Sequence, residues 1–190
     1  MALEVKDLTP AIMDDFLTFF DDIAFTDNPE WAGCYCMYYH NTGTEEEFEQ
    51  RGNNRNRKDA VEYIRSGLMQ GFLAYEEGNP IGWCNVNDKS VYPFLLKDKK
   101  LRSPEDSRCR SIVCFTVAPS HRRQGVARTL LEHVLKDHNT NHRGILEAYP
   151  RNAPSGDAER YHGPMGLYLS AGFTAVKTLE DYTIVRYISR

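Results

Sequence analysis

Apolar residues recur along this chain with two different spacings, and each spacing predicts one kind of element. Short runs of adjacent apolar residues between turn residues predict strands, whereas apolar residues three or four positions apart predict helices. The predicted strands cover residues 3–5, 71–75, 81–86, 112–117, 144–149, 173–177 and 181–188. The predicted helices cover residues 10–20, 58–66, 125–137 and 165–170. The order of these elements indicates an α/β protein with mixed α+β character.

One strand, helix and strand in the middle of the chain define the topology. The strand 112–117, the helix 125–137 and the strand 144–149 predict a parallel, right-handed crossover. The hairpins around them predict antiparallel pairing, because their strands are joined by short polar turns such as residues 76–80. We therefore expect one domain over residues 1–190, with a central mixed, mainly antiparallel sheet flanked by helices.

Residues 26–56 follow neither spacing. Asn28-Pro29, Gly33 and Gly43 interrupt the segment, and aromatic residues crowd between positions 31 and 40. A connection of this length without periodic structure is commonly a lid or a binding loop. We expect this segment to shape a binding site.

Composition places the chain among ordinary globular proteins. Hydrophobic residues make up 41% of the chain and charged residues 26%. No apolar run is long enough to cross a bilayer, and the first residues, MALEVKDLTP, lack the basic and then apolar order of a secretory signal. We therefore expect a cytoplasmic protein without a membrane partner.

The cysteine count and the charge narrow the possible partners. Five cysteines, an odd number, predict reduced thiols rather than a disulfide framework. A net charge of −4 argues against a general nucleic-acid binder. Basic residues gather locally in residues 51–58, 97–110 and 122–128. A polyanion should therefore bind in one pocket or stripe rather than over the whole surface.

A short basic turn joins the strand 112–117 to the helix 125–137. The first N–H groups of a helix lack intrahelical acceptors and carry partial positive charge, so phosphate oxygens fit that end. Gly125 and Ala127 are small enough to let a phosphate approach the main chain. Arg122, Arg123 and Arg128 add positive charge. The turn therefore predicts an anion site, the alternative being a basic helix start on a solvated surface.

The spacing of Arg122, Gly125 and Ala127 fits Arg/Gln-x-x-Gly-x-Gly/Ala and resembles the acyl-CoA loop of the GNAT superfamily of N-acetyltransferases. The resemblance covers residues 71–173 and implies the GNAT fold, with acetyl-CoA as cosubstrate. It also implies that main-chain groups of the strand 112–117 hold the pantetheine arm and polarise the thioester carbonyl. The cofactor-binding residues that it implies are Phe115, Thr116, Val117, Arg122, Arg123, Gln124, Gly125, Val126, Ala127 and Arg128.

Tyr168, followed by Gly172-Phe173, is the second point of resemblance. Many GNAT enzymes end their last core helix in this way, with the tyrosine hydroxyl near the cofactor sulfur. The resemblance therefore implies that Tyr168 donates a proton to the departing thiolate. A general acid of this kind contributes about 10²- to 10⁴-fold in rate. The alternative is an aromatic ring that only packs under the sheet.

Attack of an amine on a thioester also requires a group that accepts the amine proton. Glu147 is the candidate general base, because it interrupts the apolar strand 144–149 and buried strands rarely hold an isolated carboxylate. An ion pair near the strand end is the equally weighted alternative. Ser111 and Tyr161 depart from the family pattern, which has a glutamate and a cofactor-contacting asparagine there. A water relay through Glu147, His162 or Tyr161 therefore stays open.

The aromatic residues of the segment 26–56 predict the acceptor site. By analogy with the GNAT fold, where this connection shapes the acceptor pocket, we expect a substrate wall built from Trp31, Tyr35, Tyr38 and Tyr39. The alternative is a second small core under the long loop. Cys34, Cys36 and His40 suggest zinc, but Cys-x-Cys is not the usual ligand spacing and no matching pair follows. We therefore expect no metal.

These features predict an N-acetyltransferase that moves an acetyl group from acetyl-CoA to a primary amine by direct attack in a ternary complex. A small molecule or a peptide end could supply the amine, and the protein could be a monomer or a homodimer. Cys114, on the cofactor strand, leaves a covalent route open. The alternatives are a noncatalytic acyl-CoA sensor with the same pocket and a nucleic-acid-binding protein that uses the arginine clusters.

Overall fold

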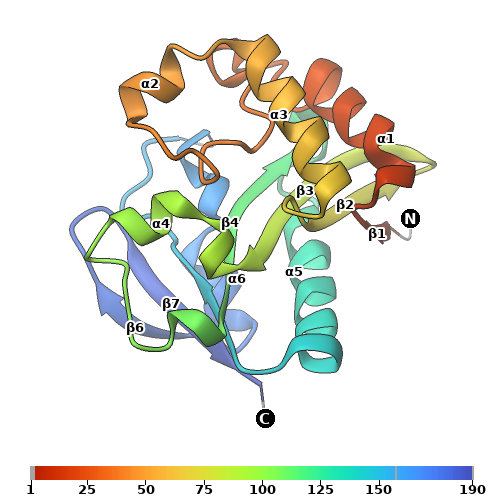
Figure 1. Ribbon diagram of the computed structural model, residues 1–190. Helices are drawn as coiled ribbons and strands as arrows, with labels where there is room; N and C mark the ends of the chain where they lie inside the picture. The colour runs from red at the N-terminus through yellow and green to blue at the C-terminus, as the bar shows by residue number, and fades with distance from the viewer. Residues whose placement is uncertain (1–2, 157, 190) are drawn as a thin grey trace.

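A seven-stranded sheet forms the centre of the molecule (Figure 1). The computed structural model describes residues 3–156 and 158–189. The strands are β1 (Glu4–Asp7), β2 (Gly71–Glu76), β3 (Asn79–Asp88), β4 (Cys109–Val117), β5 (Ile145–Ala148), β6 (Thr174–Thr178) and β7 (Thr183–Ile188), in the spatial order β1-β2-β3-β4-β5-β7-β6. Neighbouring strands are antiparallel except for the parallel pair β4 and β5. The predicted mixed, mainly antiparallel sheet with one parallel crossover is confirmed.

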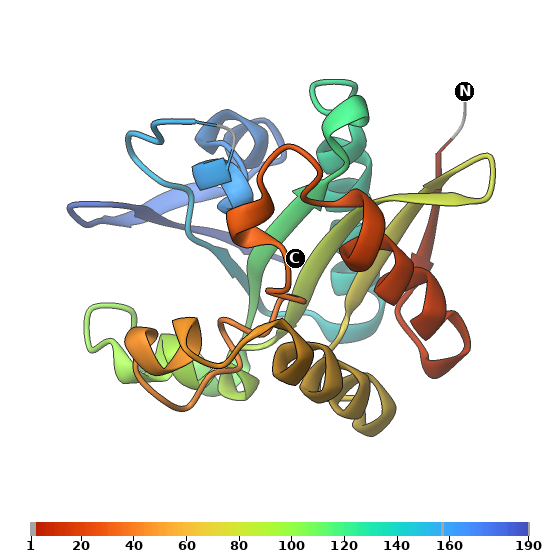
Figure 2. The ribbon, with the colours of Figure 1, turned by 90° about the horizontal axis from the view of Figure 1, so that it is seen from above.

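Helices cover both faces of this sheet. They are α1 (Met13–Thr18), α2 (Glu45–Glu49), α3 (Asn53–Ser66), α4 (Pro93–Lys97), α5 (Val126–Asp137) and α6 (Met165–Ser170). Seen from above, α5 lies behind β2 and β3, whereas α1 and α3 lie in front of them (Figure 2). None of the described helices is both long and apolar enough to cross a membrane.

Two neighbouring residues of β3 show how the sheet holds its two helical layers. Successive residues of a strand point to opposite faces. Trp83 packs its ring 5.0 Å from that of Phe16 in α1, between ring centroids. Gly82 faces α5, where a Cβ on this glycine would lie 2.7 Å from Cγ1 of Val126. Only glycine therefore lets the start of α5 pack this closely on the sheet.

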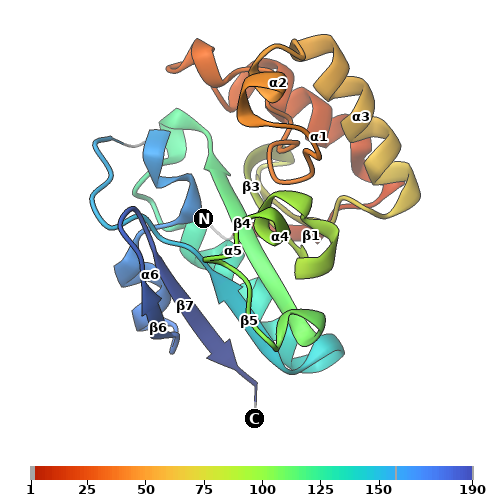
Figure 3. The same cartoon turned by 60° about the vertical axis from the view of Figure 1, so that its left-hand side comes forward.

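A bulge in β4 opens the sheet on its β5 side. Asn85 pairs with Cys114 and Val86 with Ile112, so Val113 is an extra residue in β4. On its other side β4 pairs with β5 only from Cys109 to Ile112. Beyond that point the short helical segment Ala158–His162 packs beside β4 in place of a strand. Figure 3 shows β4 running through the middle of the sheet between β3 and β5.

The predicted elements differ from the structure mainly at their ends. The helix expected over residues 10–20 is divided into a 3₁₀ turn at Pro10–Ile12, the helix α1 and a π turn at Phe19–Ile23. The helix expected over residues 58–66 begins earlier, because α3 starts at Asn53. The helices α2 and α4 were not predicted, since neither carries an extended apolar repeat.

Candidate active site

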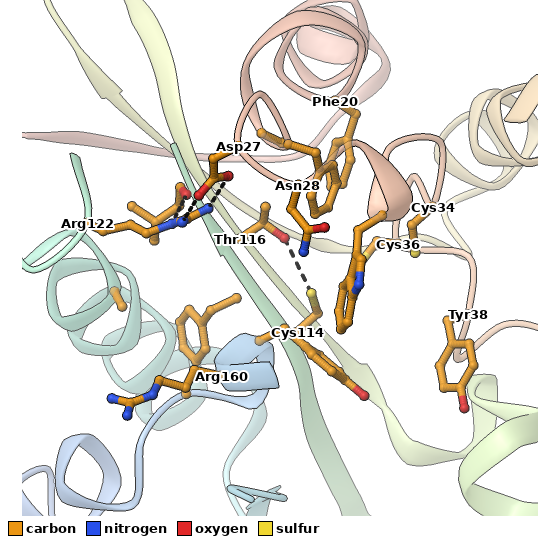
Figure 4. A pocket seen from close by; sticks show the side chains of 18 of the residues that line it. Phe20, Asp27, Asn28, Cys34, Cys36, Tyr38, Cys114, Thr116, Arg122 and Arg160 are labelled. Atoms are coloured by element: carbon orange, nitrogen blue, oxygen red, sulfur yellow. Dashed lines mark hydrogen bonds and ion pairs between the residues drawn. The ribbon is translucent and has the colours of Figure 1, made fainter. Parts of the chain in front are cut away.

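A cavity of about 1210 Å³ lies between the start of α5, the end of β4 and the segment 26–56. Side chains from these elements point into it (Figure 4). Its walls include Phe20, Asp27, Asn28, Glu30, Trp31, Tyr38, Tyr39, Glu49, Cys114, Phe115, Thr116, Val117, Arg122, Arg123, Gly125, Val126, Ala127, Arg128, Arg151, Arg160 and Tyr161. The predicted phosphate loop and most of the predicted acceptor wall therefore share one cavity.

The turn before α5 presents its main chain to this cavity. Gly125 is the residue before the helix and has a φ of 92°, which disfavours a larger residue. A Cβ built on Gly125 meets no atom within 4 Å, so the space in front of the helix start is open. The first N–H groups of α5 have no acceptor inside the helix. This end of the cavity can bind an anion through the main chain.

The three arginines of the turn have different surroundings. Arg122 forms a two-pronged ion pair with Asp27, with Nη2 3.0 Å from Oδ1, and its Nε donates to the carbonyl of Val117 at 3.3 Å (Figure 4). The hydrogen bond from Arg122 lowers the pKa of Asp27. Arg122 thus fastens the segment 26–56 to the loop, whereas Arg123 and Arg128 line the cavity.

Gln124 lies differently from the other predicted loop residues. Its Nε2 donates to the carbonyl of Ser120 at 2.7 Å, and its side chain is exposed. Gln124 is not among the residues that line the cavity. Its side chain supports the turn, and cofactor contact by Gln124 stays a prediction for its main chain.

The free edge of β4 forms the floor of the cavity. The N–H of Ala118 donates to the carbonyl of Ile81 in β3 at 2.9 Å. Because main-chain groups alternate in direction along a strand, those of Val117 and Phe115 face away from β3. The carbonyl of Val117 accepts from Arg122 on that side. The N–H groups of Phe115 and Val117 therefore face the side of β4 where β5 no longer pairs with it. Next to them, the Thr116 hydroxyl lies 3.5 Å from the Cys114 thiol.

Three of the four aromatic residues predicted for the acceptor wall line the cavity: Trp31, Tyr38 and Tyr39. Tyr35 does not: its backbone has a φ of 44°, and its hydroxyl donates to Asp21. The Tyr35 ring packs against Phe20 in the core. Tyr35 is therefore part of the main core rather than of a second small core, and a substrate contact by Tyr35 stays a prediction.

Tyr161 completes the aromatic wall from the opposite side. Its ring lies 5.4 Å from that of Trp31, between centroids. Burial raises the pKa of Tyr161, and hydrogen bonds with Tyr39 and Arg151 act in the opposite direction. The hydroxyl of Tyr161 therefore lies within a polar cluster beside β4.

Tyr168 is buried and does not line the cavity. Its hydroxyl donates to the main-chain carbonyl of His162 at 2.5 Å. Nε2 of His162 lies 2.9 Å from the hydroxyl of Tyr39. Tyr168 thus reaches the cavity through two intervening residues, and proton donation by its hydroxyl stays a prediction. Burial lowers the pKa of His162 to about 3, so the imidazole is neutral at neutral pH.

Glu147 lies outside the cavity, in a buried cluster of charges. Its carboxylate is 2.8 Å from Nζ of Lys89 and 2.7 Å from Nε of Arg186, and it accepts from the hydroxyl of Tyr149 at 2.7 Å. Lys89 also pairs with Asp106 at 2.8 Å. The ion-pair alternative for Glu147 is the one that the structure contains. Its geometry does not support a general base, because cations hold both oxygens away from the acceptor wall.

Three thiols, those of Cys34, Cys36 and Cys114, also line the cavity. Burial raises the pKa of Cys34 to about 12, so its thiol stays protonated. His40 lies apart from them, with its ring packed between those of Tyr63 and Tyr92. Within residues 3–156 and 158–189, no three His, Cys, Asp or Glu side chains form a group that could hold a metal ion.

Sequence reasoning did not single out Asp27, Asn28, Arg151 or Arg160 as lining residues. Arg151 carries the one usable signal, since it follows the predicted parallel strand 144–149 at its carboxyl end. Ligand sites in sheets with parallel strands commonly lie beyond the carboxyl ends of the strands. Asp27 gives no such signal, because its partner Arg122 is 95 positions away.

Comparisons with known proteins bear on this arrangement. A model of the Acetyltransferase (GNAT) family matches residues 30–162. No curated protein matches the sequence significantly. Among solved structures, the PaiA N-acetyltransferase of Thermoplasma acidophilum in complex with coenzyme A is similar over 99% of both chains, with a TM-score of 0.57 and 15% identity.

Two further structures share the fold. YncA, a putative acetyltransferase of Salmonella typhimurium with its cofactor acetyl-CoA, is 16% identical with a TM-score of 0.57, over 99% of this chain and 94% of the other. The ribosomal-protein-S18-alanine N-acetyltransferase of Escherichia coli is 16% identical with a TM-score of 0.53, over 100% of this chain and 96% of the other. At these identities the likeness shows the fold, and the family match covers more than half of the sequence. The chain therefore belongs to the GNAT acetyltransferase family.

Proposed function

We propose that this protein transfers the acetyl group of acetyl-CoA to the primary amine of an acceptor, by direct attack within a ternary complex. The observation that carries the proposal is one continuous cavity, which joins the start of α5 to the aromatic wall across the free edge of β4. A donor and an acceptor bound at its two ends would meet above β4. Two structural neighbours are described as complexes with coenzyme A or acetyl-CoA, which supports the choice of donor.

The turn before α5 fits the diphosphate of acetyl-CoA. The space that a side chain at position 125 would occupy is open, and the main-chain N–H groups of Val126 and Ala127 lie at the positive end of the helix dipole. Arg123 and Arg128 line the same end of the cavity. We assign phosphate binding to these groups, with Arg122 positioning the loop through Asp27. Bound acetyl-CoA supplies the acetyl group as a thioester.

The free edge of β4 is suited to hold the acyl end of the donor. The N–H groups of Phe115 and Val117 face the cavity side, where β5 no longer pairs with β4. An N–H group aimed at a carbonyl oxygen that gains negative charge stabilises the transition state by about 3 kcal/mol. We assign this role to one of these two N–H groups.

The polar cluster around Tyr161 is suited to receive the amine proton. The hydroxyl of Tyr39 lies 2.9 Å from Nε2 of the neutral imidazole of His162, and the ring of Tyr161 lies 4.2 Å from that of His162, between centroids. Tyr39 and Tyr161 both line the cavity. We propose that these two hydroxyls relay the amine proton to water in the cavity, each accepting one proton and releasing its own, with His162 as the positioning residue that keeps Tyr39 oriented.

The test is an assay of the purified protein with acetyl-CoA and a panel of primary amines. We expect thiol release that depends on the amine and saturates, an acetylated amine by mass spectrometry, and intersecting double-reciprocal plots as a ternary complex requires. Parallel double-reciprocal plots, together with loss of activity in Cys114→Ser, would instead support the covalent route. Background thiol release with every amine, together with a rise in Tm on adding acetyl-CoA, would favour the noncatalytic sensor.

A further inference from the structure

Arg151 differs from the other charged residues of the cavity in its position. It lies just beyond β5, which ends at Ala148, and a bridge to Tyr182 fixes its main chain. At this level β4 and β5 have already diverged, so Arg151 lies across the opening from the free edge of β4. Its side chain is partly buried and lines the cavity.

The neighbours of Arg151 belong to the acceptor wall. Tyr38, Tyr39 and Tyr161 line the same cavity as Arg151, and the guanidinium lies near enough to Tyr161 to oppose the rise in its pKa that burial causes. Arg123 and Arg128, by contrast, lie at the start of α5. The cavity therefore carries positive charge away from the start of α5, at Arg151 and at Arg160, and the charge at Arg151 is on the acceptor side.

Among the residues that the structure describes, Arg151 also has no carboxylate in ion-pair contact. Arg122 is paired with Asp27, and Arg186 with Glu147, but no ion pair of Arg151 occurs within the described part of the chain. Glu159 acts on Arg151 only over a distance, and its carboxylate is held by the N–H of Ser155 at 2.7 Å. A guanidinium has five N–H donors, so most donors of Arg151 are available to a ligand.

The carboxylates of the cavity wall do not cancel this charge. Asp27 is occupied by Arg122, and Glu30 and Glu49 are exposed to water, which screens them. A guanidinium with free donors in a partly buried aromatic setting binds a carboxylate in a two-pronged arrangement. An acceptor amine above β4 would place a neighbouring carboxylate of the same molecule toward Arg151.

From this geometry we propose that the acceptor is an amino acid or a similar small molecule that carries a carboxylate beside its primary amine, and that Arg151 binds the carboxylate. The inference rests on the proposed acetyl transfer, since it names the substrate class of the same cavity. Arg151 is then a specificity-determining residue of the acceptor site.

The experiment compares amino acids with their carboxamides and with the amines that lack the carboxyl group. For the wild-type protein we expect kcat/KM to be about 10- to 100-fold higher for the carboxylates, in line with a charge-assisted pair of hydrogen bonds. Arg151→Gln should remove this preference by raising KM for the carboxylates alone. Arg151→Lys should keep part of it, because Lys retains the charge but not the fork.

Arg65→Gln is the matched control, because Arg65 is an exposed arginine of α3 outside the cavity. It should leave the preference unchanged. Equal kcat/KM for carboxylates and carboxamides in the wild-type protein would overturn the inference, and that comparison needs no variant to fold. An unchanged preference in Arg151→Gln would overturn it as well.

Two other results would point elsewhere. Weaker coenzyme A binding in Arg151→Gln, with no change in acceptor preference, would mean that Arg151 binds a phosphate of the cofactor and would overturn the acceptor assignment. Absence of thiol release with every amine, in the wild-type protein too, would refute the proposed transferase activity itself. The failure of the inference and the failure of the proposed function are thereby distinguished.

Discussion

The hydroxyl of Tyr168 donates a hydrogen bond to the main-chain carbonyl of His162 at 2.5 Å, inside the protein. The imidazole of His162 in turn holds the hydroxyl of Tyr39, which lines the cavity. A residue of α6 therefore fixes the segment that packs beside the free edge of β4. Tyr168 influences the acceptor wall by positioning this segment, in addition to any role as a proton donor.

Tyr168→Phe should lower kcat with little change in coenzyme A affinity, because the cofactor loop is not touched. It should also destabilise the fold by about 1–3 kcal/mol, since a buried carbonyl loses its donor. Steady-state kinetics measures kcat, calorimetric titration measures the affinity for coenzyme A, and urea unfolding measures the stability. Loss of the alkaline limb of the pH–rate profile would indicate a proton donor, whereas a retained limb would indicate positioning. A wild-type kcat in Tyr168→Phe would rule out both roles. The control is Tyr187→Phe, which removes a hydroxyl that is hydrogen-bonded to the exposed Asn139.

Gly125→Glu should abolish coenzyme A binding, because the new side chain puts bulk and negative charge in front of the start of α5. Gly78→Glu is a closely matched control. Gly78 has a φ of 83° and Gly125 a φ of 92°, and a Cβ on either glycine meets no atom within 4 Å. The backbone strain of both variants is therefore similar, at about 1–2 kcal/mol. Calorimetric titration that finds wild-type affinity in Gly125→Glu would mean that the diphosphate binds elsewhere.

Glu147→Gln should destabilise the fold by about 3 kcal/mol, because Lys89 and Arg186 lose a buried counter-charge. The midpoint of urea unfolding measures this loss. Glu105→Gln, which removes the exposed-side partner of Arg186, should move the midpoint far less. At temperatures where Glu147→Gln is folded, its pH–rate profile should keep the wild-type acid limb. A lost limb would restore Glu147 as the general base.

The stability of the protein should fall as the pH drops from 6.5 to about 4, partly because of His40. Burial lowers the pKa of this ring from 6.5 to about 4. In that window the unfolded chain binds a proton that the folded ring does not, so the free energy of unfolding decreases by up to about 1.4 kcal/mol per pH unit. His40→Phe should reduce this slope, as measured by Tm between pH 7 and pH 4.5. Identical slopes for both proteins would show that His40 is not held neutral by the fold.

The local elements could be predicted because their signals are contiguous. Gly67 and Gly172 mark the ends of α3 and α6, and the apolar stripe of α5 gives its length. The start of α3 at Asn53 could not be predicted, because its first turn is polar and follows Gly52. The helix α2 depends on a capping box between Thr44 and Glu47, within a segment that has no apolar period.

The candidate site likewise has one part that could be predicted from the sequence and another that could not. The loop around Gly125 could be predicted because small residues, arginines and a helix start follow one another in the sequence. The pair formed by Tyr39 and His162 could not, since the two residues are 123 positions apart. Tyr35 and Tyr38 look alike in the sequence, and only the path of the chain sends one into the core and the other into the cavity.

The bulge at Val113 has a consequence for the cohesion of the whole molecule. Within the sheet, β1 to β4 form one half, and β5, β7 and β6 form the other. The two halves are joined by the four residue pairs between β4 and β5. The cavity lies over the end of this boundary at which β4 and β5 no longer pair. A ligand that spans this opening contacts both halves of the sheet. Part of its binding free energy therefore adds to the free energy of unfolding of the protein.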